Sequence, residues 1–170
     1  MSKQILRIVV IGANSTGKTS FISRANTERV DFVDTSGMES MDMYGNNTYM
    51  DANGIVLIYD VTSPTSFSAL PLYQTMVKAA IEEGVPIFLV GNKTDLRNQR
   101  CVSADMGKGY AKRNNFKFYE ISTTDDVLDT YQNCLQSILK RAKKRNYKHK
   151  QTEQANRLLR AAGRRLDKSL

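Results

Sequence analysis

Apolar and polar residues are arranged in two kinds of segment up to about residue 145. Short, nearly continuous apolar runs rich in β-branched residues are typical of strands buried on both faces of a sheet. They occupy residues 5–11, 54–60 and 85–90, and a weaker one occupies 116–121. The stretches between and after them predict helices at 18–26, 66–83 (with Pro64 just ahead), 104–113 and 126–145. Strands that alternate with helices predict an α/β domain with a parallel sheet.

The composition agrees with one folded domain. Of 170 residues, 41% are hydrophobic and 25% are charged, which excludes a disordered polymer and a fibre. No apolar run approaches the roughly 20 residues that span a bilayer, and Arg7 interrupts the first run, so we expect a cytoplasmic protein. Cys101, Cys134 and the single histidine, His149, lie far apart in the chain and predict neither a disulfide framework nor a zinc site.

The net charge of +8 is concentrated at one end of the chain. Residues 140–170 hold twelve lysines and arginines against two acidic residues, whereas residues 1–139 hold thirteen bases and fifteen acids. We therefore divide the chain into a nearly neutral domain at 1–145 and a basic tail at 146–170.

The basic tail admits several interpretations. Leu158, Ala162, Leu166 and Leu170 recur at every fourth residue, which is compatible with a short amphipathic helix. Such a tail could hold the protein at an anionic membrane surface, contact nucleic-acid phosphates, direct the protein to the nucleus, or remain a solvated extension.

The segment after the first predicted strand reads GANSTGKT and matches the phosphate-loop pattern G-x-x-x-x-G-K-[ST], in the strand-loop-helix setting that this pattern requires. Glycines let the backbone curl so that amide groups face an anion, and the following helix adds its positive end. Lys18 supplies a charge for the β- and γ-phosphates, and Thr19 supplies a hydroxyl for Mg²⁺. The candidate nucleotide-binding residues of this segment are Gly12, Asn14, Ser15, Thr16, Gly17, Lys18, Thr19 and Ser20.

A second candidate segment, Asn92-Lys93-Thr94-Asp95, follows the predicted strand at 85–90. Open α/β sheets bind ligands at the carboxyl ends of their strands, where this segment belongs. The Asp95 carboxylate can accept hydrogen bonds from both N1–H and the exocyclic amine of guanine, whereas adenine has no N1–H to donate. Asp95 therefore favours a guanine nucleotide and argues against an ATP-using kinase.

These segments appear in the order in which the Ras-like small GTPases carry them, and the chain resembles that family over residues 3–141. The resemblance implies a P-loop NTPase fold with a doubly wound sheet, and GDP or GTP bound with Mg²⁺. It assigns Thr19 and Asp34 to the metal, Gly37 to the γ-phosphate, Asn92, Lys93 and Asp95 to the base, and Ser122, Thr123 and Thr124 to the turn beside the base. Residues 48–54, 85–87 and 91–96 look closer to Ras and Rap than to Rab or Arf proteins.

The chain departs from the family between Lys18 and Asp34, where only 15 residues intervene. One helix and one strand use all of them, so the switch I loop and an antiparallel edge strand are missing. Thr27 lies only nine positions past Lys18 and does not replace the magnesium-binding threonine of that loop. We expect five parallel strands in the order 3-1-4-5-6 of the family's numbering, with residues 30–33 at an open edge that invites self-pairing or a partner strand.

A second departure concerns hydrolysis. Met38 stands where the family usually has a glutamine that orients the attacking water, and a thioether cannot do this. Asn14 replaces a small glycine and could crowd an arginine finger. We expect guanine-nucleotide binding with very slow GTP hydrolysis and a protein partner near the switch II region or the open edge.

Two alternatives remain open at this point. The chain could be a pseudo-GTPase, a scaffold that binds nucleotide statically or not at all, or it could be a shortened form of an ordinary switch protein. Ras relatives commonly end in a prenylated cysteine, but no cysteine follows Cys134, so we expect no prenyl anchor.

Overall fold

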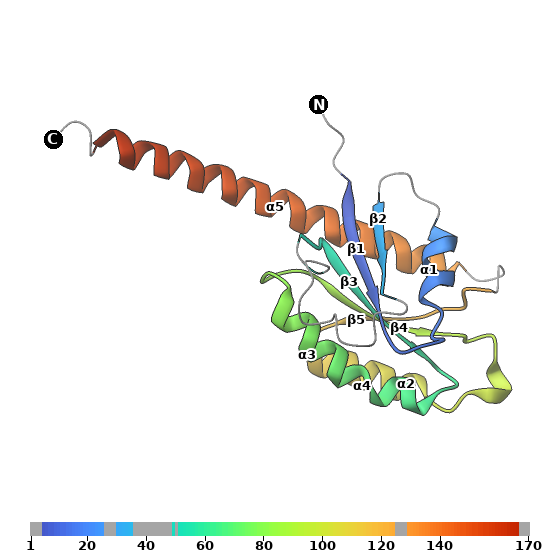
Figure 1. Ribbon diagram of the computed structural model, residues 1–170. Coiled ribbons are helices and arrows are strands. Elements are labelled where there is room, and N and C mark those ends of the chain that lie inside the picture. The colour runs from blue at the N-terminus through green and yellow to red at the C-terminus, as the bar shows by residue number, and fades with distance from the viewer. Residues whose placement is uncertain (1–4, 26–29, 36–48, 50, 125–128, 167–170) are drawn as a thin grey trace.

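The computed structural model describes residues 5–25, 30–35, 49, 51–124 and 129–166, with the backbone alone for residues 161–166. Its centre is a five-stranded, wholly parallel sheet in the order β2-β1-β3-β4-β5 (Figure 1). The strands are β1 (Leu6–Ile11), β2 (Val30–Asp34), β3 (Gly54–Asp60), β4 (Ile87–Asn92) and β5 (Lys117–Glu120). The predicted α/β class and strand order are confirmed, since β2 corresponds to the third strand of the family's numbering.

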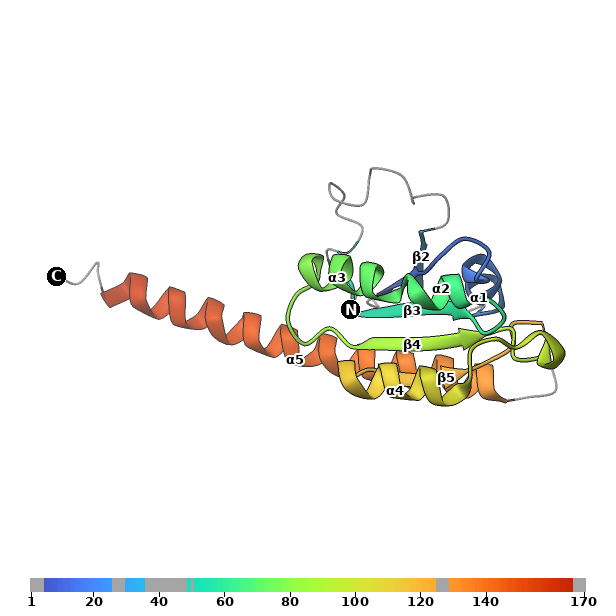
Figure 2. The ribbon, with the colours of Figure 1, turned by 90° about the horizontal axis from the view of Figure 1, so that it is seen from below.

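Helices cover both faces of the sheet (Figures 1 and 2). They are α1 (Lys18–Ala25), α2 (Pro64–Ser68), α3 (Leu70–Ala80), α4 (Ala104–Asn114) and α5 (Thr130–Leu166). Side chains alternate along each strand, so Ile8 and Val10 of β1 pack with the α1–α5 layer, while Val9 and Ile11 pack with the α2–α3–α4 layer. The near-continuous apolar runs of the strands thus reflect burial on both faces.

The second predicted helix is divided in two. The sequence predicts one helix over 66–83, but α2 ends at Ser68 and α3 begins at Leu70. Pro71 has no N–H with which to bond the Phe67 carbonyl, which interrupts the helical ladder at this point. Pro64 lies inside α2, at its first turn, with the Ser63 side chain capping the helix by accepting a hydrogen bond from the Ser66 N–H at 3.2 Å.

The last helix is longer than predicted. The sequence ends it near Arg145, whereas α5 continues without interruption to Leu166. Its packed part ends close to Asn146, and every described residue from 151 to 160 is exposed. Figures 1 and 2 show this second half of α5 projecting beyond the sheet. The predicted start at Asp126 lies outside the described residues.

One edge of the sheet is formed by β2, whose only strand neighbour in the described part of the chain is β1. The predicted open edge at residues 30–33 therefore lies where the strand order requires it. Within the described residues, no helix has the length and apolar character needed to cross a membrane.

Candidate functional site

The loop between β1 and α1 depends on two glycines. A Cβ atom at Gly12 would lie 2.0 Å from the Ile58 carbonyl oxygen, so only glycine lets the loop begin this close to β3. Gly17 has φ +91°, and a Cβ there would lie 2.3 Å from the Asn92 amide nitrogen. Ser15 also has a positive φ, of 61°. Residues of this conformation turn backbone N–H groups inward, which creates an anion-binding concavity.

Lys18, the first residue of α1, lies under this loop with only 3% of its surface exposed. Its ammonium group donates to the Gly12 carbonyl at 2.8 Å and to the Ala13 carbonyl at 2.9 Å. Thr16 is fully buried and donates its hydroxyl to the same Ala13 carbonyl at 2.9 Å. These hydrogen bonds therefore define the shape of the loop and hold the Lys18 ammonium group beside it.

Two candidate metal ligands meet beside the loop. The Thr19 hydroxyl, from α1, donates to the Asp34 carboxylate at the end of β2 at 2.6 Å. A hydroxyl and a carboxylate offer the oxygen atoms that Mg²⁺ prefers, and Mg²⁺ at nucleotide sites takes its remaining ligands from phosphates and water. The pair fits that role, and no cluster of three or more His, Cys, Asp or Glu side chains elsewhere in the described residues offers another metal site.

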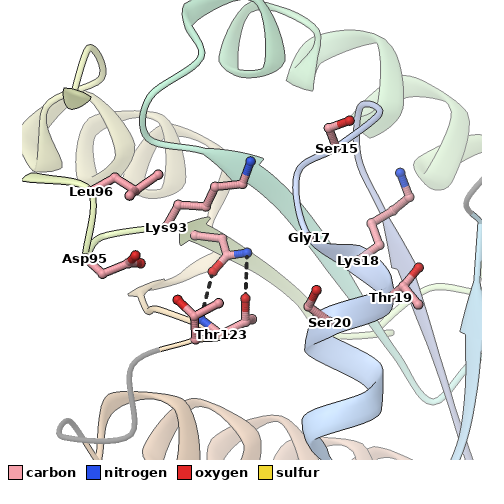
Figure 3. A pocket seen from close by; sticks show the side chains of 11 residues that line it. Ser15, Gly17, Lys18, Thr19, Ser20, Lys93, Asp95, Leu96 and Thr123 are labelled. Carbon is pink, nitrogen blue, oxygen red and sulfur yellow. Dashed lines mark hydrogen bonds between the residues drawn. The ribbon is translucent and has the colours of Figure 1, made fainter.

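Asn92, at the end of β4, joins the phosphate loop to the segment after β5. Its side chain is fully buried and donates to the Thr16 carbonyl at 2.9 Å. It also donates to the Thr123 hydroxyl at 3.4 Å (Figure 3). Its amide oxygen accepts the Thr123 N–H at 3.2 Å. Asn92 therefore holds together two loops that are far apart in the sequence, in addition to the contact with the base that the sequence predicts.

The neighbouring Lys93 binds a carboxylate that the sequence interpretation missed. Lys93 adopts φ 65°, and its ammonium group lies 2.7 Å from Asp60 at the end of β3. Burial alone would raise the pKa of Asp60, but hydrogen bonds from Lys93 and Thr62 outweigh it and hold the pKa below its usual value. The feature of the sequence that could have identified Asp60 is its position as a charged residue at the end of an otherwise apolar strand.

These elements enclose a cavity of about 510 Å³. Figure 3 shows Lys93, Asp95 and Leu96 on one side of it, facing Ser15, Gly17, Lys18, Thr19 and Ser20 on the other. Asn92, Thr123 and Thr124 also line it. Asp95 is exposed to the cavity, and Leu96, which the sequence interpretation missed, offers an apolar contact for a flat base.

The remaining predicted residues lie outside the cavity wall. Gly12, Asn14 and Thr16 shape the loop, and Ser122 is buried behind it, where its hydroxyl accepts the Thr124 N–H at 3.2 Å. Gly37, Met38 and Thr27 lie outside the described residues, as does the switch II region that begins after Asp34 and Thr35. The candidate nucleotide site is thus described at its phosphate and base ends only.

Comparisons with known proteins agree with this geometry. The model of the Ras family matches residues 25–144, a range that begins after the phosphate loop. The Ras-related protein Rab-3A of Homo sapiens is 30% identical over 149 residues, covering 72% of this chain and 68% of that protein. Rab-3 of Caenorhabditis elegans is 29% identical with the same coverage, and Rab-3C of Bos taurus is 28% identical, with 66% of it covered. The predicted family is confirmed, but the predicted Ras and Rap branch is not, because these relatives are Rab-3 proteins.

Proposed function

Because this chain belongs to the Ras family of small GTP-binding proteins, we propose that it binds GDP or GTP with Mg²⁺ in the 510 Å³ cavity. The observation that carries this proposal is that Lys18 and Asp95 line opposite walls of the same cavity. A nucleotide needs a cation and inward-facing amides at its phosphates and a discriminating group at its base. The cavity lies at the carboxyl ends of β1 and β4, where open α/β sheets hold ligands.

At the phosphate end, the loop from Gly12 to Thr19 supplies the amides and Lys18 supplies the charge. Lys18 exchanges its bonds with the Gly12 and Ala13 carbonyls for bonds with phosphate oxygens as the nucleotide enters. Thr19 and Asp34 hold Mg²⁺, which neutralises phosphate charge when bound. The 2.6 Å contact between their oxygen atoms supports this assignment.

At the base end, Asp95 accepts the N1–H and amine protons of guanine, and Asn92 keeps Thr123 and the phosphate loop at a fixed separation. Lys93 is held by Asp60, so its hydrocarbon stem borders the cavity while its charge is neutralised. Ser122 and Thr124 brace the turn beside the base.

We propose further that hydrolysis of bound GTP is very slow. Met38 cannot orient water, and the segment between Lys18 and Asp34 is too short for a switch I loop. Nucleotide binding without rapid turnover is therefore expected, because residues suited to the phosphates and the base line the cavity while the water-orienting glutamine is replaced by Met38.

The binding test is a titration of the full chain with fluorescent GDP and GTP analogues, with and without Mg²⁺. We expect Mg²⁺-dependent saturation, and we expect Asp95→Asn to shift preference from guanine to xanthine nucleotide, since an amide reverses one donor-acceptor pair. Asp105→Asn, on the exposed surface of α4, is the matched control and keeps the guanine preference. Absence of binding at millimolar nucleotide would instead make the chain a pseudo-GTPase scaffold.

The hydrolysis test is a single-turnover measurement with GTP already bound, so that release of product does not enter the rate. We expect turnover well below that of family members that carry the glutamine, and an increase in Met38→Gln. A rate in the parent chain equal to that of ordinary family members contradicts the proposal.

We also propose that the outer edge of β2 is a contact site for a second copy of this chain or a partner strand. Unpaired backbone groups on an edge strand form hydrogen bonds readily with another strand. A mass that rises with concentration in light scattering supports self-pairing, and a monomeric mass across the series counts against it.

A further inference from the structure

A second cavity, of about 840 Å³, lies at the opposite end of the sheet from the nucleotide cavity. Its walls are the start of β5, the turn that precedes β4 and one face of α5. Six lysine and arginine side chains line it. Arg145 pairs with Glu82, and the other five define the cavity: Lys117, Lys140, Arg141, Lys144 and Lys148. We call this cavity the basic groove. The carboxylate that shares its wall is Glu83.

In the part of the chain that the structure describes, the lining of the basic groove holds more positive than negative charge. Within the described part of the chain, none of its five defining cations forms an ion pair with a carboxylate. Arg145 and His149 also line the cavity but contact Glu82, His149 at 3.2 Å. This contact fixes α5 against the turn before β4 and leaves the neighbouring cations available to a ligand.

The cations are arranged to act together. Lys140, Lys144 and Lys148 follow one another at four-residue spacing, so they lie on one face of α5 about 6 Å apart along its axis. Lys117 approaches from β5, on the other wall. Arg141 adds a planar group that can bind phosphate oxygens in pairs. Like charges held this close repel one another, and a ligand with several anionic groups relieves that repulsion at several places at once.

We propose that the basic groove binds a compact polyanion carrying several phosphate groups, either free in solution or as the headgroup of a lipid. The volume lies within the range of about 300–1,000 Å³ that is typical of small-ligand sites. The site is independent of the proposed nucleotide site, because the two cavities share no lining residue.

The residues that continue the lysine face of α5 toward its carboxyl end bear on whether the phosphates belong to a lipid or to a free molecule. Leu158 follows Lys140 by 18 residues, which are five full turns, and Leu159 follows Lys148 by 11 residues, about three turns. Both leucines therefore point to the same side as the lysines, and they are 66% and 70% exposed. When the phosphates belong to a lipid headgroup, these leucines lie where they can enter the apolar layer next to it.

The test is calorimetric titration of the full chain with inositol hexakisphosphate. We expect saturable binding that weakens with salt and falls about tenfold or more in the triple variant Lys140→Gln, Lys144→Gln, Lys148→Gln. The matched control is Lys143→Gln, Lys150→Gln, Arg157→Gln, which removes the same charge from residues of the same helix that do not line the groove. We expect less than about a threefold change in that control.

Two further arms locate the ligand and its source. Lys18→Gln removes the cation of the phosphate loop and leaves inositol hexakisphosphate binding unchanged if the groove is the site. Sedimentation with phosphatidylcholine vesicles that contain phosphatidylinositol bisphosphate tests the lipid source. Loss of vesicle binding in Leu158→Gln, Leu159→Gln, with unchanged binding of the soluble probe, assigns the site to a headgroup, whereas binding of the soluble probe alone assigns it to a free polyphosphate.

The proposal is overturned by three results. One is the absence of binding to both the soluble probe and the vesicles. Another is an equal loss in the groove variant and its matched control, which shows attraction to net charge alone. The third is preferential binding of a single-stranded RNA to the whole of α5, with both triple variants equally impaired. Thermal unfolding of each variant confirms that it is folded.

Discussion

Asn92 shows how one residue can serve the fold and shape the candidate nucleotide site at once. Its amide bonds the Thr16 carbonyl and the Thr123 N–H, which belong to loops after β1 and β5. Thr123 lines the candidate cavity and Thr16 lies behind its wall, so these bonds hold two sides of the cavity together. A buried side chain with bonds to two loops cannot be replaced without leaving polar groups unpaired.

We predict that Asn92→Ala lowers the free energy of unfolding by about 2–3 kcal/mol, because the buried carbonyl of Thr16 and the partly buried N–H of Thr123 lose their partner. Urea denaturation measures the change. Asn98→Ala, in the exposed turn Arg97–Gln99, is the control and should alter the midpoint by less than about 0.5 kcal/mol. Equal effects in the two variants would refute the role assigned to Asn92.

Two fully buried tyrosines differ in one hydrogen bond. The Tyr131 hydroxyl donates to the Phe21 carbonyl at 2.6 Å, which ties α5 to α1. The Tyr59 hydroxyl is buried and has no hydrogen-bond partner among the described residues. A bonded hydroxyl contributes to stability, whereas an unbonded one in the core costs desolvation.

The same substitution therefore has different consequences at the two sites. We predict that Tyr131→Phe lowers the free energy of unfolding by about 1 kcal/mol, while Tyr59→Phe leaves it unchanged or raises it slightly. Chemical denaturation of both variants beside the parent chain checks this. A loss in Tyr59→Phe as large as that in Tyr131→Phe would contradict it.

At the scale of elements, the site is assembled by the ends of strands. Asp34, Asp60 and Asn92 each end a strand. Because all strands are parallel, these carboxyl ends lie at the same end of the sheet. The pair of Asp60 and Lys93 links β3 to the loop after β4 at 2.7 Å. The side chain of Asp60 is only 8% exposed, so removal of its charge leaves a half-buried lysine without its partner.

We predict that Asp60→Asn lowers the free energy of unfolding by about 1–3 kcal/mol at pH 7. The pKa of Asp60 is lowered in the folded state, so its contribution is present above the ordinary aspartate pKa and is lost as the pH falls below about 4. The difference between parent and variant should therefore disappear in acid. Asp105→Asn, whose carboxylate is 95% exposed, should show little difference at any pH in the same denaturation series.

The whole molecule consists of a packed α/β body and a projecting half of one helix. The first half of α5 buries Tyr131, Cys134, Leu135, Ile138 and Ala142 against the sheet. The contact between Arg145 and Glu82 fixes the last packed turn, and beyond it the helix has exposed residues. The first half of α5 therefore contributes to stability, and the second half provides the projecting surface.

We predict that truncation after Thr152 changes the free energy of unfolding by less than about 0.5 kcal/mol, because the described residues removed are exposed. Truncation after Leu139 removes Ala142, Arg145 and Asn146 and should cost about 3 kcal/mol or more. Thermal unfolding of the two chains measures the contrast. A large loss in the longer chain would show that the projecting half of α5 stabilises the body, contrary to this prediction.

The sequence by itself determined the sheet and the outline of the candidate nucleotide site. Apolar runs that must be buried on both faces locate the strands, and the short stretch between Lys18 and Asp34 leaves room for one helix and one parallel strand. The phosphate-loop pattern and Asp95 can be recognised from short segments of the sequence, because their chemistry depends on residues that are neighbours in the chain.

Only the tertiary structure decided which distant residues meet. The bond from Asn92 to Thr16, the pair of Lys93 and Asp60 and the cavity contact of Leu96 join segments whose spacing follows no local rule. The break at Ala69 and the continuation of α5 past Arg145 depend on one missing N–H and on helical propensity beyond the last packed turn. The basic groove likewise exists because β5 lies beside α5, which places Lys117 opposite the lysines of the helix. Periodicity describes one element at a time, whereas these features are contacts between elements.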